Sequence, residues 1–215
     1  MERNNYVNYY QKSISTIKHL KGDKKPSFLL HSCCGPCSTF PLKFLAPYFD
    51  ITIMYNNSNI YPTTEYERRL NELKKYLEFF KRDFGYDVKL IITPYNHIDY
   101  MEPLKIYADQ KEGLERCFLC YEKRMDEAFK YANDNHFDFF CTVMTISRQK
   151  DSQILNQIGA KLQSKYDYTK YFFSDYQKKK GIDYGKELAE KYNLYKQEYC
   201  GCEYSMRRLE KKNNE

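Results

Sequence analysis

Residues 27–37 read Ser27-Phe28-Leu29-Leu30-His31-Ser32-Cys33-Cys34-Gly35-Pro36-Cys37. The stretch begins with a short apolar run of strand length and passes into a turn that contains glycine, proline and three cysteines. Residues compatible with a helix follow from about Ser38 to Tyr48. This order predicts a strand, a cysteine-rich loop and a helix, which is the repeating unit of a parallel α/β sheet.

The same alternation recurs along the chain. Short apolar runs predict further strands at Ile51–Tyr55, Val88–Ile92 and Phe137–Val143. Apolar residues at helical spacing predict helices at about residues 6–20, Thr64–Phe84, Cys117–Asn135 and Asp151–Ser164. We therefore expect a single α/β domain over residues 1–215, with an N-terminal helix in about residues 1–22 and a catalytic core over residues 23–210.

The composition is that of a globular protein, with 42% hydrophobic and 30% charged residues. The sequence contains no apolar run long enough to span a membrane, and its first residues lack the apolar stretch of a secretory signal. We expect a cytoplasmic protein with no membrane partner, in a compartment where thiol buffers keep cysteines reduced. The formal net charge of +6 favours an anionic partner.

Seven of the eight cysteines fall into three tight clusters. The clusters are Cys33, Cys34 and Cys37; Cys117 and Cys120; and Cys200 and Cys202. In a reducing compartment such clusters indicate metal binding or redox chemistry rather than structural disulfides. A four-iron cluster takes four thiolates, so seven sulfurs exceed the needs of one such cluster or of one zinc ion. Cys141 lies alone in an apolar strand, and we assign it to the core.

The predicted fold favours a common site for these cysteines. In an open parallel sheet the loops after the strands gather at the carboxyl edge, so Cys33–Cys37 and Thr145–Asp151 are expected to converge. A helix N-terminus favours thiolate over thiol, which suits the first cluster. The three-residue offset in the second cluster brings two sulfurs to one side of a helical turn, and the glycine in the third lets its backbone fold tightly.

Two other functions fit parts of this pattern. Cys34-Gly35-Pro36-Cys37 is the active-site tetrapeptide of thioredoxins, so a thioredoxin-like thiol-disulfide oxidoreductase is one alternative. A zinc-binding module that binds RNA is the other. Metal analysis separates the three hypotheses, because they predict iron with sulfide, no metal, or zinc alone.

Three motifs together resemble the QueH-type epoxyqueuosine reductase family. They are Cys33-Cys34-Gly35-Pro36-Cys37, Arg116-Cys117-Phe118-Leu119-Cys120-Tyr121 and Tyr199-Cys200-Gly201-Cys202. The segments Tyr55–Pro62, Glu65–Arg69 and Leu194–Tyr199 are also similar to that family, and the match extends from about Phe28 to Ser205. The sequence departs from the family at Thr145–Asp151, where relatives more often carry a proline and a tyrosine after the serine.

The resemblance implies a Rossmann-like parallel sheet of the HUP type, flanked by helices, with a cysteine-rich metal site at its carboxyl edge. It also implies a [4Fe–4S] cluster with an adjacent iron ion, and the two-electron reduction of epoxyqueuosine to queuosine at the wobble position of tRNA. The partners would be a tRNA that carries epoxyqueuosine and an electron donor that the sequence does not identify. We expect all seven clustered cysteines to be metal ligands.

Other residues are candidates for catalysis or binding. His31 is a candidate proton donor near the substrate, and Asp151 is a candidate oxygen ligand or orienting group. The alternatives are a packing role for His31 and a helix N-cap role for Asp151. The candidates for phosphate contacts with tRNA are Arg68, Arg69, Arg116, Arg124 and Arg148. For each arginine, the alternative is a solvated or ion-paired side chain.

Overall fold

The structure is a computed structural model and describes residues 6–213. Its centre is a sheet of five parallel strands in the order β3-β2-β1-β4-β5. The strands are β1 (Ser27–His31), β2 (Asp50–Tyr55), β3 (Lys89–Ile92), β4 (Phe139–Thr142) and β5 (Lys170–Tyr171). This order is that of a Rossmann-like sheet, so the predicted fold class is confirmed.

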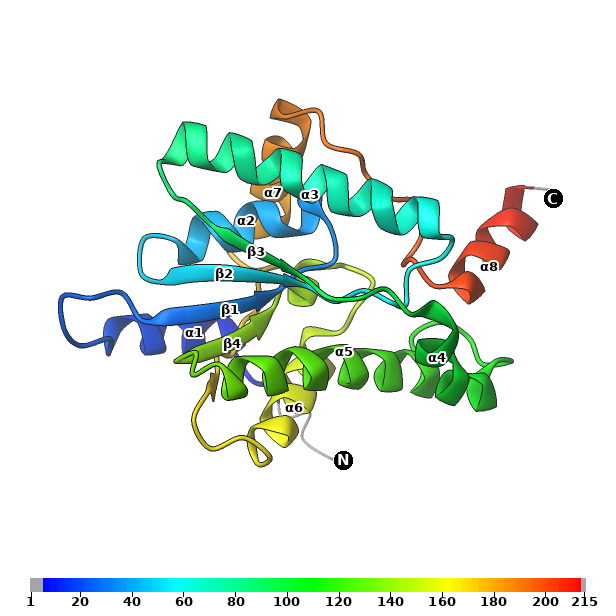
Figure 1. Cartoon of the computed structure of the whole chain (residues 1–215), viewed down its shortest axis with the longest axis horizontal. Helices are drawn as coiled ribbons and strands as arrows, with labels where there is room; N and C mark the ends of the chain where they lie inside the picture. The colour runs from blue at the N-terminus through cyan, green and yellow to red at the C-terminus, as the bar shows by residue number, and fades with distance from the viewer. Residues whose placement is uncertain (1–5, 214–215) are drawn as a thin grey trace.

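Helices cover both faces of the sheet (Figure 1). One face carries α2 (Gly35–Leu45), α3 (Thr63–Phe84) and α7 (Gly181–Lys191), and the other carries α5 (Glu115–Asp134) and α6 (Ser152–Gln163). Successive residues of a strand point to opposite faces. Phe28 and Leu30 therefore enter the first apolar core, whereas Leu29 enters the second. Helix α1 (Tyr9–Lys18) packs near β5, where Tyr9 stacks on Phe173 with ring centroids 5.5 Å apart.

The end of β1 lies at the point where the chain changes sides. From β1 the chain passes through α2 to β2, and it returns through α5 to β4 on the other side of β1. In the sheet register His31 pairs with Met54 of β2 and with Thr142 of β4. Ligand sites of open α/β sheets form at such a switch point. The first cysteine cluster follows His31 directly and so lies there.

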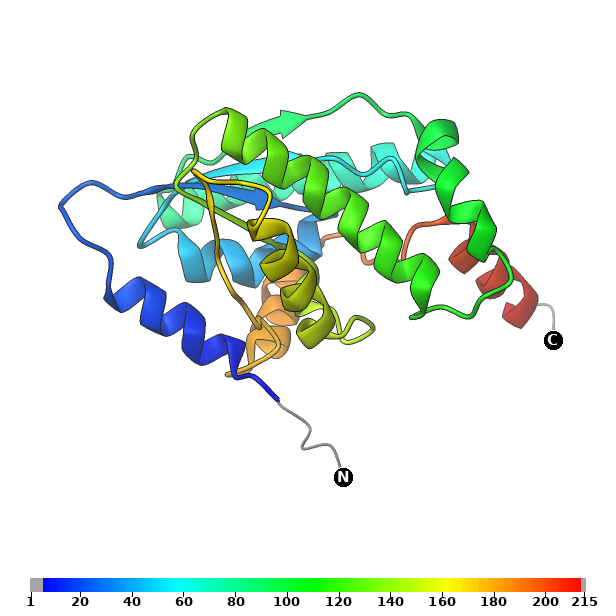
Figure 2. The same cartoon turned by 90° about the horizontal axis from the view of Figure 1, so that it is seen from below.

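Three further helices lie beyond the carboxyl edge of the sheet. They are α4 (His97–Met101), the 3-10 helix η1 (Glu102–Tyr107) and α8 (Glu203–Asn213). Figure 1 places α4 and α8 at the right, and Figure 2 shows the first turns of α5 reaching the same region. This layer brings the second and third cysteine clusters to the side of the sheet where the first one lies.

The structure differs from the sequence-based expectations at several boundaries. Helix α2 begins at Gly35 rather than near Ser38, and β4 ends at Thr142 because Val143 opens the 3-10 helix η2 (Val143–Ile146). The sequence did not predict β5, α7 or α8, because β5 has only two residues and the two helices are strongly charged. The single domain stays a prediction, and residues 1–5 and 214–215 of that range lie outside the described residues.

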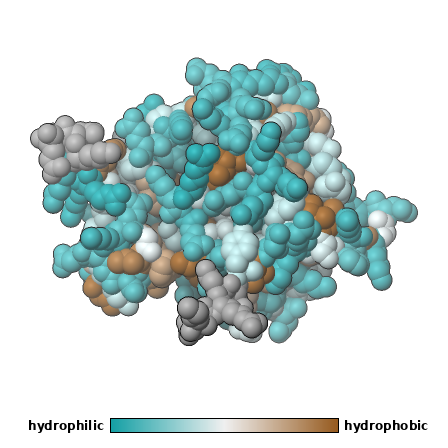
Figure 3. Space-filling model, turned by 180° about the vertical axis from the view of Figure 1, so that it is seen from behind, coloured by the Kyte–Doolittle hydropathy of each residue, from teal (hydrophilic) through white to brown (hydrophobic). Residues whose placement is uncertain are grey.

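The surface is consistent with this packing. Figure 3 shows one face that is mostly hydrophilic, with small and separate hydrophobic areas. Most large apolar residues belong instead to the two cores on either side of the sheet. Within residues 6–213, no helix is both long and apolar enough to cross a membrane.

Candidate metal centre

The first cysteine cluster is a compact group of three sulfurs. The Sγ atoms of Cys33, Cys34 and Cys37 all lie within 4.8 Å of one another. Cys34 is the N-cap of α2 in an extended conformation, and its Sγ accepts a hydrogen bond from the Cys37 backbone N–H at 3.4 Å. The start of α2 therefore holds the three sulfurs close together, as the sequence predicted for this cluster.

Close packing explains why glycine and proline separate these cysteines. A Cβ atom on Gly35 would lie 2.7 Å from the carbonyl oxygen of Glu72 in α3, so a larger residue would push α2 away from α3. Pro36 occupies the first turn of α2, where its fixed backbone angle fits and no amide hydrogen is needed. The motif thus positions three thiols and also docks two helices against each other.

Interactions among the three thiols shift their pKa values in different directions. Hydrogen bonds from Cys34 and Cys37 hold the pKa of Cys33 well below its usual value. Burial raises the pKa of Cys34, and the interaction with Cys33 raises the pKa of Cys37 to about 12. Deprotonation of all three requires positive charge at the site, which a metal supplies.

The other four clustered cysteines gather around the start of α5. Cys117 and Cys120 lie on its first turns, and Cys200 and Cys202 flank Gly201 just before α8. Burial raises the pKa of Cys117, Cys120 and Cys202, and the charge of Cys200 raises all three further. Gly201 has a φ of +123°, in the region that favours glycine, as its place between two cysteines suggested.

A buried arginine holds the third cluster in place. The Arg69 guanidinium donates to the carbonyl oxygens of Cys200 and Tyr199, each at 3.1 Å. Its Nε donates to Glu65 at 2.7 Å, and both side chains are buried. A Cβ atom on Gly201 would approach Arg69 Nη1 to 3.0 Å. Arg69 therefore fixes the loop that carries Cys200 against α3.

A second arginine and a tyrosine hold the second cluster. Arg116 Nη1 donates to the carbonyl oxygens of Tyr107, Ala108 and Gln110 at 2.9, 2.9 and 2.6 Å. The Tyr100 hydroxyl lies 2.9 Å from the carbonyl oxygen of Cys120 and 3.4 Å from its Sγ. These contacts tie the first turn of α5 to η1, to the loop after it and to α4.

A cavity of about 460 Å³ is lined by cysteines of the first and the third cluster. Cys33, Cys37 and Cys200 all contribute to its wall, together with Arg124 and Lys150. Arg124 is 1% exposed, and its Nε and Nη2 have no hydrogen-bond partner among the described residues. Burial lowers the pKa of this guanidinium, but the charge of Cys120 outweighs that effect and raises it. The cavity therefore joins thiols to a permanent buried cation.

Two residues of this cavity were missed by the sequence reasoning. Lys150 is half-buried, and the charges of Cys200 and Cys33 raise its pKa against the lowering effect of burial. Gln197 donates from Nε2 to the Sγ atoms of Cys34 and Cys37 at 3.3 and 3.6 Å. Lys150 lies in the loop predicted to meet the first cluster, so loop convergence was the signal for it. No pattern singled out Gln197.

His31 and Asp151, the two candidate catalytic residues, occupy different environments. His31 is fully buried, with Nδ1 2.7 Å from Thr142 Oγ1. Burial, followed by the charge of Arg124, lowers the pKa of His31 to about 3, so its ring is neutral near pH 7. Asp151 is exposed and caps α6 by accepting from the Gln153 N–H at 2.7 Å. Catalytic roles for both stay predictions, and Asp151 does not line the cavity with Cys33.

The five arginines proposed for tRNA divide into two groups. Arg68 and Arg148 are exposed, and Arg148 lies on the rim of the cavity. The other three are at most 5% exposed, namely Arg69, Arg116 and Arg124. Arg69 and Arg116 are committed to backbone carbonyl groups, so the structure gives them an internal bracing role. Their contact with phosphate stays a prediction. Burial of both side chains argues against it.

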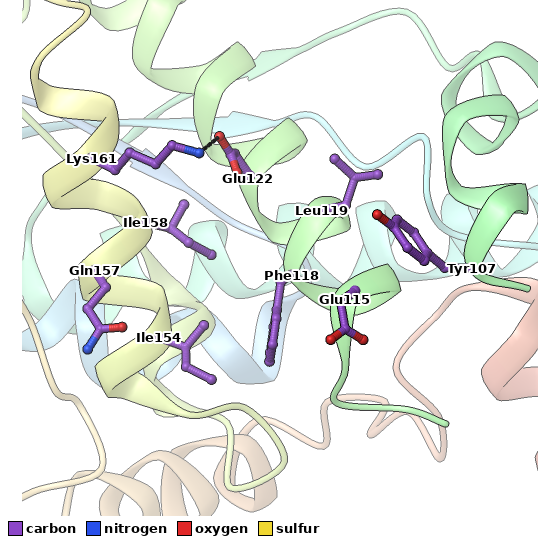
Figure 4. A pocket seen from close by; sticks show the side chains of 9 residues that line it. All are labelled: Tyr107, Glu115, Phe118, Leu119, Glu122, Ile154, Gln157, Ile158 and Lys161. Carbon is purple, nitrogen blue, oxygen red and sulfur yellow. Dashed lines mark hydrogen bonds and ion pairs between the residues drawn. The ribbon is translucent and has the colours of Figure 1, made fainter. Parts of the chain in front are cut away.

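A second cavity of about 330 Å³ lies between α5 and α6 (Figure 4). Phe118, Ile154 and Ile158 line it, and Lys161 pairs with Glu122 at 2.8 Å at its edge. None of the described residues that line it is a cysteine. Its chemistry is that of a surface groove between two helices, so the candidate site is the cavity that contains the thiols.

The sequence matches one family of known proteins. A family profile described as "Epoxyqueuosine reductase QueH" matches residues 28–208. The chain is 41% identical over 183 residues to the protein of that name from Staphylococcus aureus, covering 84% of this chain and 76% of that one. It is 37% identical to the protein of that name from Streptococcus pyogenes, covering 86% and 72%.

One solved structure has a weaker likeness to the chain. It is the U34-tRNA thiolase NcsA from Methanococcus maripaludis with its [4Fe-4S] cluster. The TM-score is 0.47 and the sequences are 15% identical, with 91% of this chain and 67% of that one covered.

Proposed function

Because this chain belongs to the epoxyqueuosine reductase QueH family, we propose that it reduces epoxyqueuosine to queuosine at the wobble position of tRNA. The observation that carries the proposal is the meeting of Cys33, Cys37 and Cys200 in one cavity beside Arg124 and Lys150. The family match supplies the substrate, and the cavity supplies a place where cysteine thiols, buried Arg124 and half-buried Lys150 face a common space.

We propose that the seven clustered cysteines hold a [4Fe–4S] cluster and an adjacent iron ion. Cys33, Cys34 and Cys37 fit three corners of a cluster because their sulfurs already converge at the start of α2. The four cysteines near the start of α5 would provide the fourth cluster ligand and bind the additional iron. When bound, such a centre supplies electrons and an affinity for oxygen. Its thiolates would also compensate the buried charge of Arg124.

The reaction adds two electrons and two protons to the epoxide and releases water as an alkene forms. In this chain Arg124 and Lys150 place positive charge beside the cavity, which stabilises negative charge that develops on the departing oxygen. Neutral His31 keeps its ring fixed against Thr142 and leaves Nε2 without a partner among the described residues. A proton reaches the oxygen more readily from a cation such as Lys150 than from His31.

The cavity rim suits a tRNA anticodon loop. Arg148, Lys186 and Lys196 are exposed along the rim, where they can contact phosphate groups. A cavity of about 460 Å³ has room for a base that has left the stack. The electron donor is a separate partner that this chain does not identify, and we place the reaction in the cytoplasm, where tRNA is modified.

The thioredoxin-like alternative fits the site less well. A thioredoxin-type nucleophile is the first cysteine of its motif and needs a lowered pKa. Here that residue is Cys34, and burial raises its pKa. The zinc alternative leaves three of the seven clustered cysteines without a role, since one zinc ion takes four ligands.

The proposal is tested with anaerobically prepared protein and tRNA that carries epoxyqueuosine. Dithionite serves as the electron source, and nucleosides released from the tRNA are separated and identified by mass spectrometry. We expect queuosine, lighter than the substrate by one oxygen atom, with native protein and none with Cys34→Ser. An iron-loaded protein that leaves epoxyqueuosine unchanged would overturn the proposed function.

A further inference from the structure

Gln197 is placed to act on the metal centre without binding metal. It lies in the loop between α7 and Cys200 and lines the cavity that contains Cys33 and Cys37. Its Nε2 is 3.3 Å from Cys34 Sγ and 3.6 Å from Cys37 Sγ, both within the range for hydrogen bonds to sulfur. One amide group therefore contacts two of the three clustered sulfurs.

The orientation of this amide is determined by the sulfurs. Gln197 Oε1 is buried and has no hydrogen-bond partner among the described residues. The opposite orientation would point the carbonyl oxygen at the sulfurs, which repel it once they are thiolates. The amide hydrogens instead face the sulfurs, at the cost of an unpaired buried oxygen. The N–H groups of Gln197 are therefore directed at the sulfurs of Cys34 and Cys37.

The donors are distributed unevenly over the three sulfurs. Cys34 Sγ accepts from the Cys37 backbone N–H as well as from Gln197. In the part of the chain that the structure describes, no N–H group donates to Cys33 Sγ, which lies 4.0 Å from Cys34 Sγ. Cys34 is thus the sulfur on which N–H groups converge, and among the described residues Gln197 supplies its side-chain N–H donor.

We propose that Gln197 is a positioning residue that raises the reduction potential of the iron-sulfur cluster through N–H···S bonds to Cys34 and Cys37. The inference rests on the proposed function, in which these two cysteines are cluster ligands. A cluster that accepts one electron gains one negative charge, mostly shared with its sulfurs. N–H dipoles directed at those sulfurs stabilise the reduced form more than the oxidised form. Gln197 thereby makes the cluster easier to reduce.

The test compares the native protein with Gln197→Met, which keeps the length of the side chain and removes its N–H groups. Gln197→Asn is the second variant, because it keeps the amide but is too short to reach both sulfurs. Gln149→Met is the matched control, since Gln149 lines the same cavity and, among the described residues, its side chain forms no hydrogen bond to sulfur. For each protein, iron and sulfide are quantified, and the cluster is titrated with dithionite and redox mediators while its EPR signal is recorded.

We expect both Gln197 variants to keep native iron and sulfide contents and to show a more negative midpoint potential. Gln149→Met should match the native potential. A native potential in Gln197→Met and Gln197→Asn would overturn the inference, as would loss of iron from both, because Gln197 would then only hold the cluster in place. Native protein that binds no iron or sulfide would instead overturn the proposed function on which the inference rests.

Discussion

Cys33, Cys34 and Cys37 lie on one continuous strand-turn-helix segment, whereas the other four clustered cysteines come from two segments far apart in the sequence. The first group is positioned by β1, by the cap of α2 and by the close packing at Gly35. The second group is held by hydrogen bonds from arginine side chains to backbone carbonyl groups, above all those of Arg69 and Arg116. The core of the fold therefore positions the first cysteine group, and buried arginines position the second.

The largest effect is expected from breaking the first group. Cys34→Ser should remove most of the iron and all of the sulfide, because a neutral hydroxyl is a poor substitute for thiolate. Cys141→Ser is the control, since Cys141 is fully buried in β4 and contacts Ser174 Oγ at 3.2 Å, away from the other cysteines. It should keep native iron and lose about 1 kcal/mol of stability. The reverse pattern of iron contents would show that the ligands are wrongly assigned.

A smaller effect is expected from loosening the second group. Arg69→Met removes the hydrogen bonds to the carbonyl oxygens of Cys200 and Tyr199. It also leaves the Glu65 carboxylate buried without its ion-pair partner. The free energy of unfolding should fall by about 3 kcal/mol, and the iron bound in excess of sulfide should decrease. Urea unfolding and metal quantitation measure the two effects.

Arg68→Met is the matched control for that variant. Arg68 is the neighbouring residue of α3, and it is exposed and stacked over Tyr195 at 3.4 Å. Its substitution should change stability by less than about 0.5 kcal/mol and leave the iron content unchanged. Equal effects of the two substitutions would contradict the bracing role of Arg69.

The contrast between the two cysteine groups also explains which parts of the site could be predicted from the sequence. β1 and the cysteine-rich turn after it were predictable because a local apolar run and a local motif define them. Arg69 and Arg124 were interpreted as surface cations because arginine is usually exposed. Helical spacing held a signal, since Arg124 lies three and four residues from buried Tyr121 and Ala128. That signal indicates burial, but it does not reveal which distant carbonyl or thiol group the guanidinium meets.

Gln197 could not be predicted from any local pattern. Its contacts with Cys34 and Cys37 join residues more than a hundred positions apart. The route of the loop before Cys200 depends on its docking to α3, where the Tyr195 N–H donates to Glu72 at 2.8 Å. Long-range docking of this kind is a property of the folded chain and leaves no periodicity in the sequence.

The smallest effect is expected at the rim of the cavity. Arg148 is 72% exposed at its side chain, and its ion pair with Asp183 is long, at 3.6 Å. Arg148→Ala should weaken tRNA binding and reduce the slope of log affinity against log salt concentration by about one. Lys24→Ala is the control, because Lys24 is exposed before β1, at the opposite edge of the sheet. An unchanged slope in Arg148→Ala would place the tRNA elsewhere on the surface.

Quantitation of iron, sulfide and zinc in anaerobically purified native protein is the most direct test of a site built from two cysteine groups. The proposed centre, with seven cysteine ligands, predicts a brown protein with about four sulfides per chain, more iron than sulfide and negligible zinc. Colourless protein that retains full reductase activity, or protein that contains zinc without sulfide, would contradict the account.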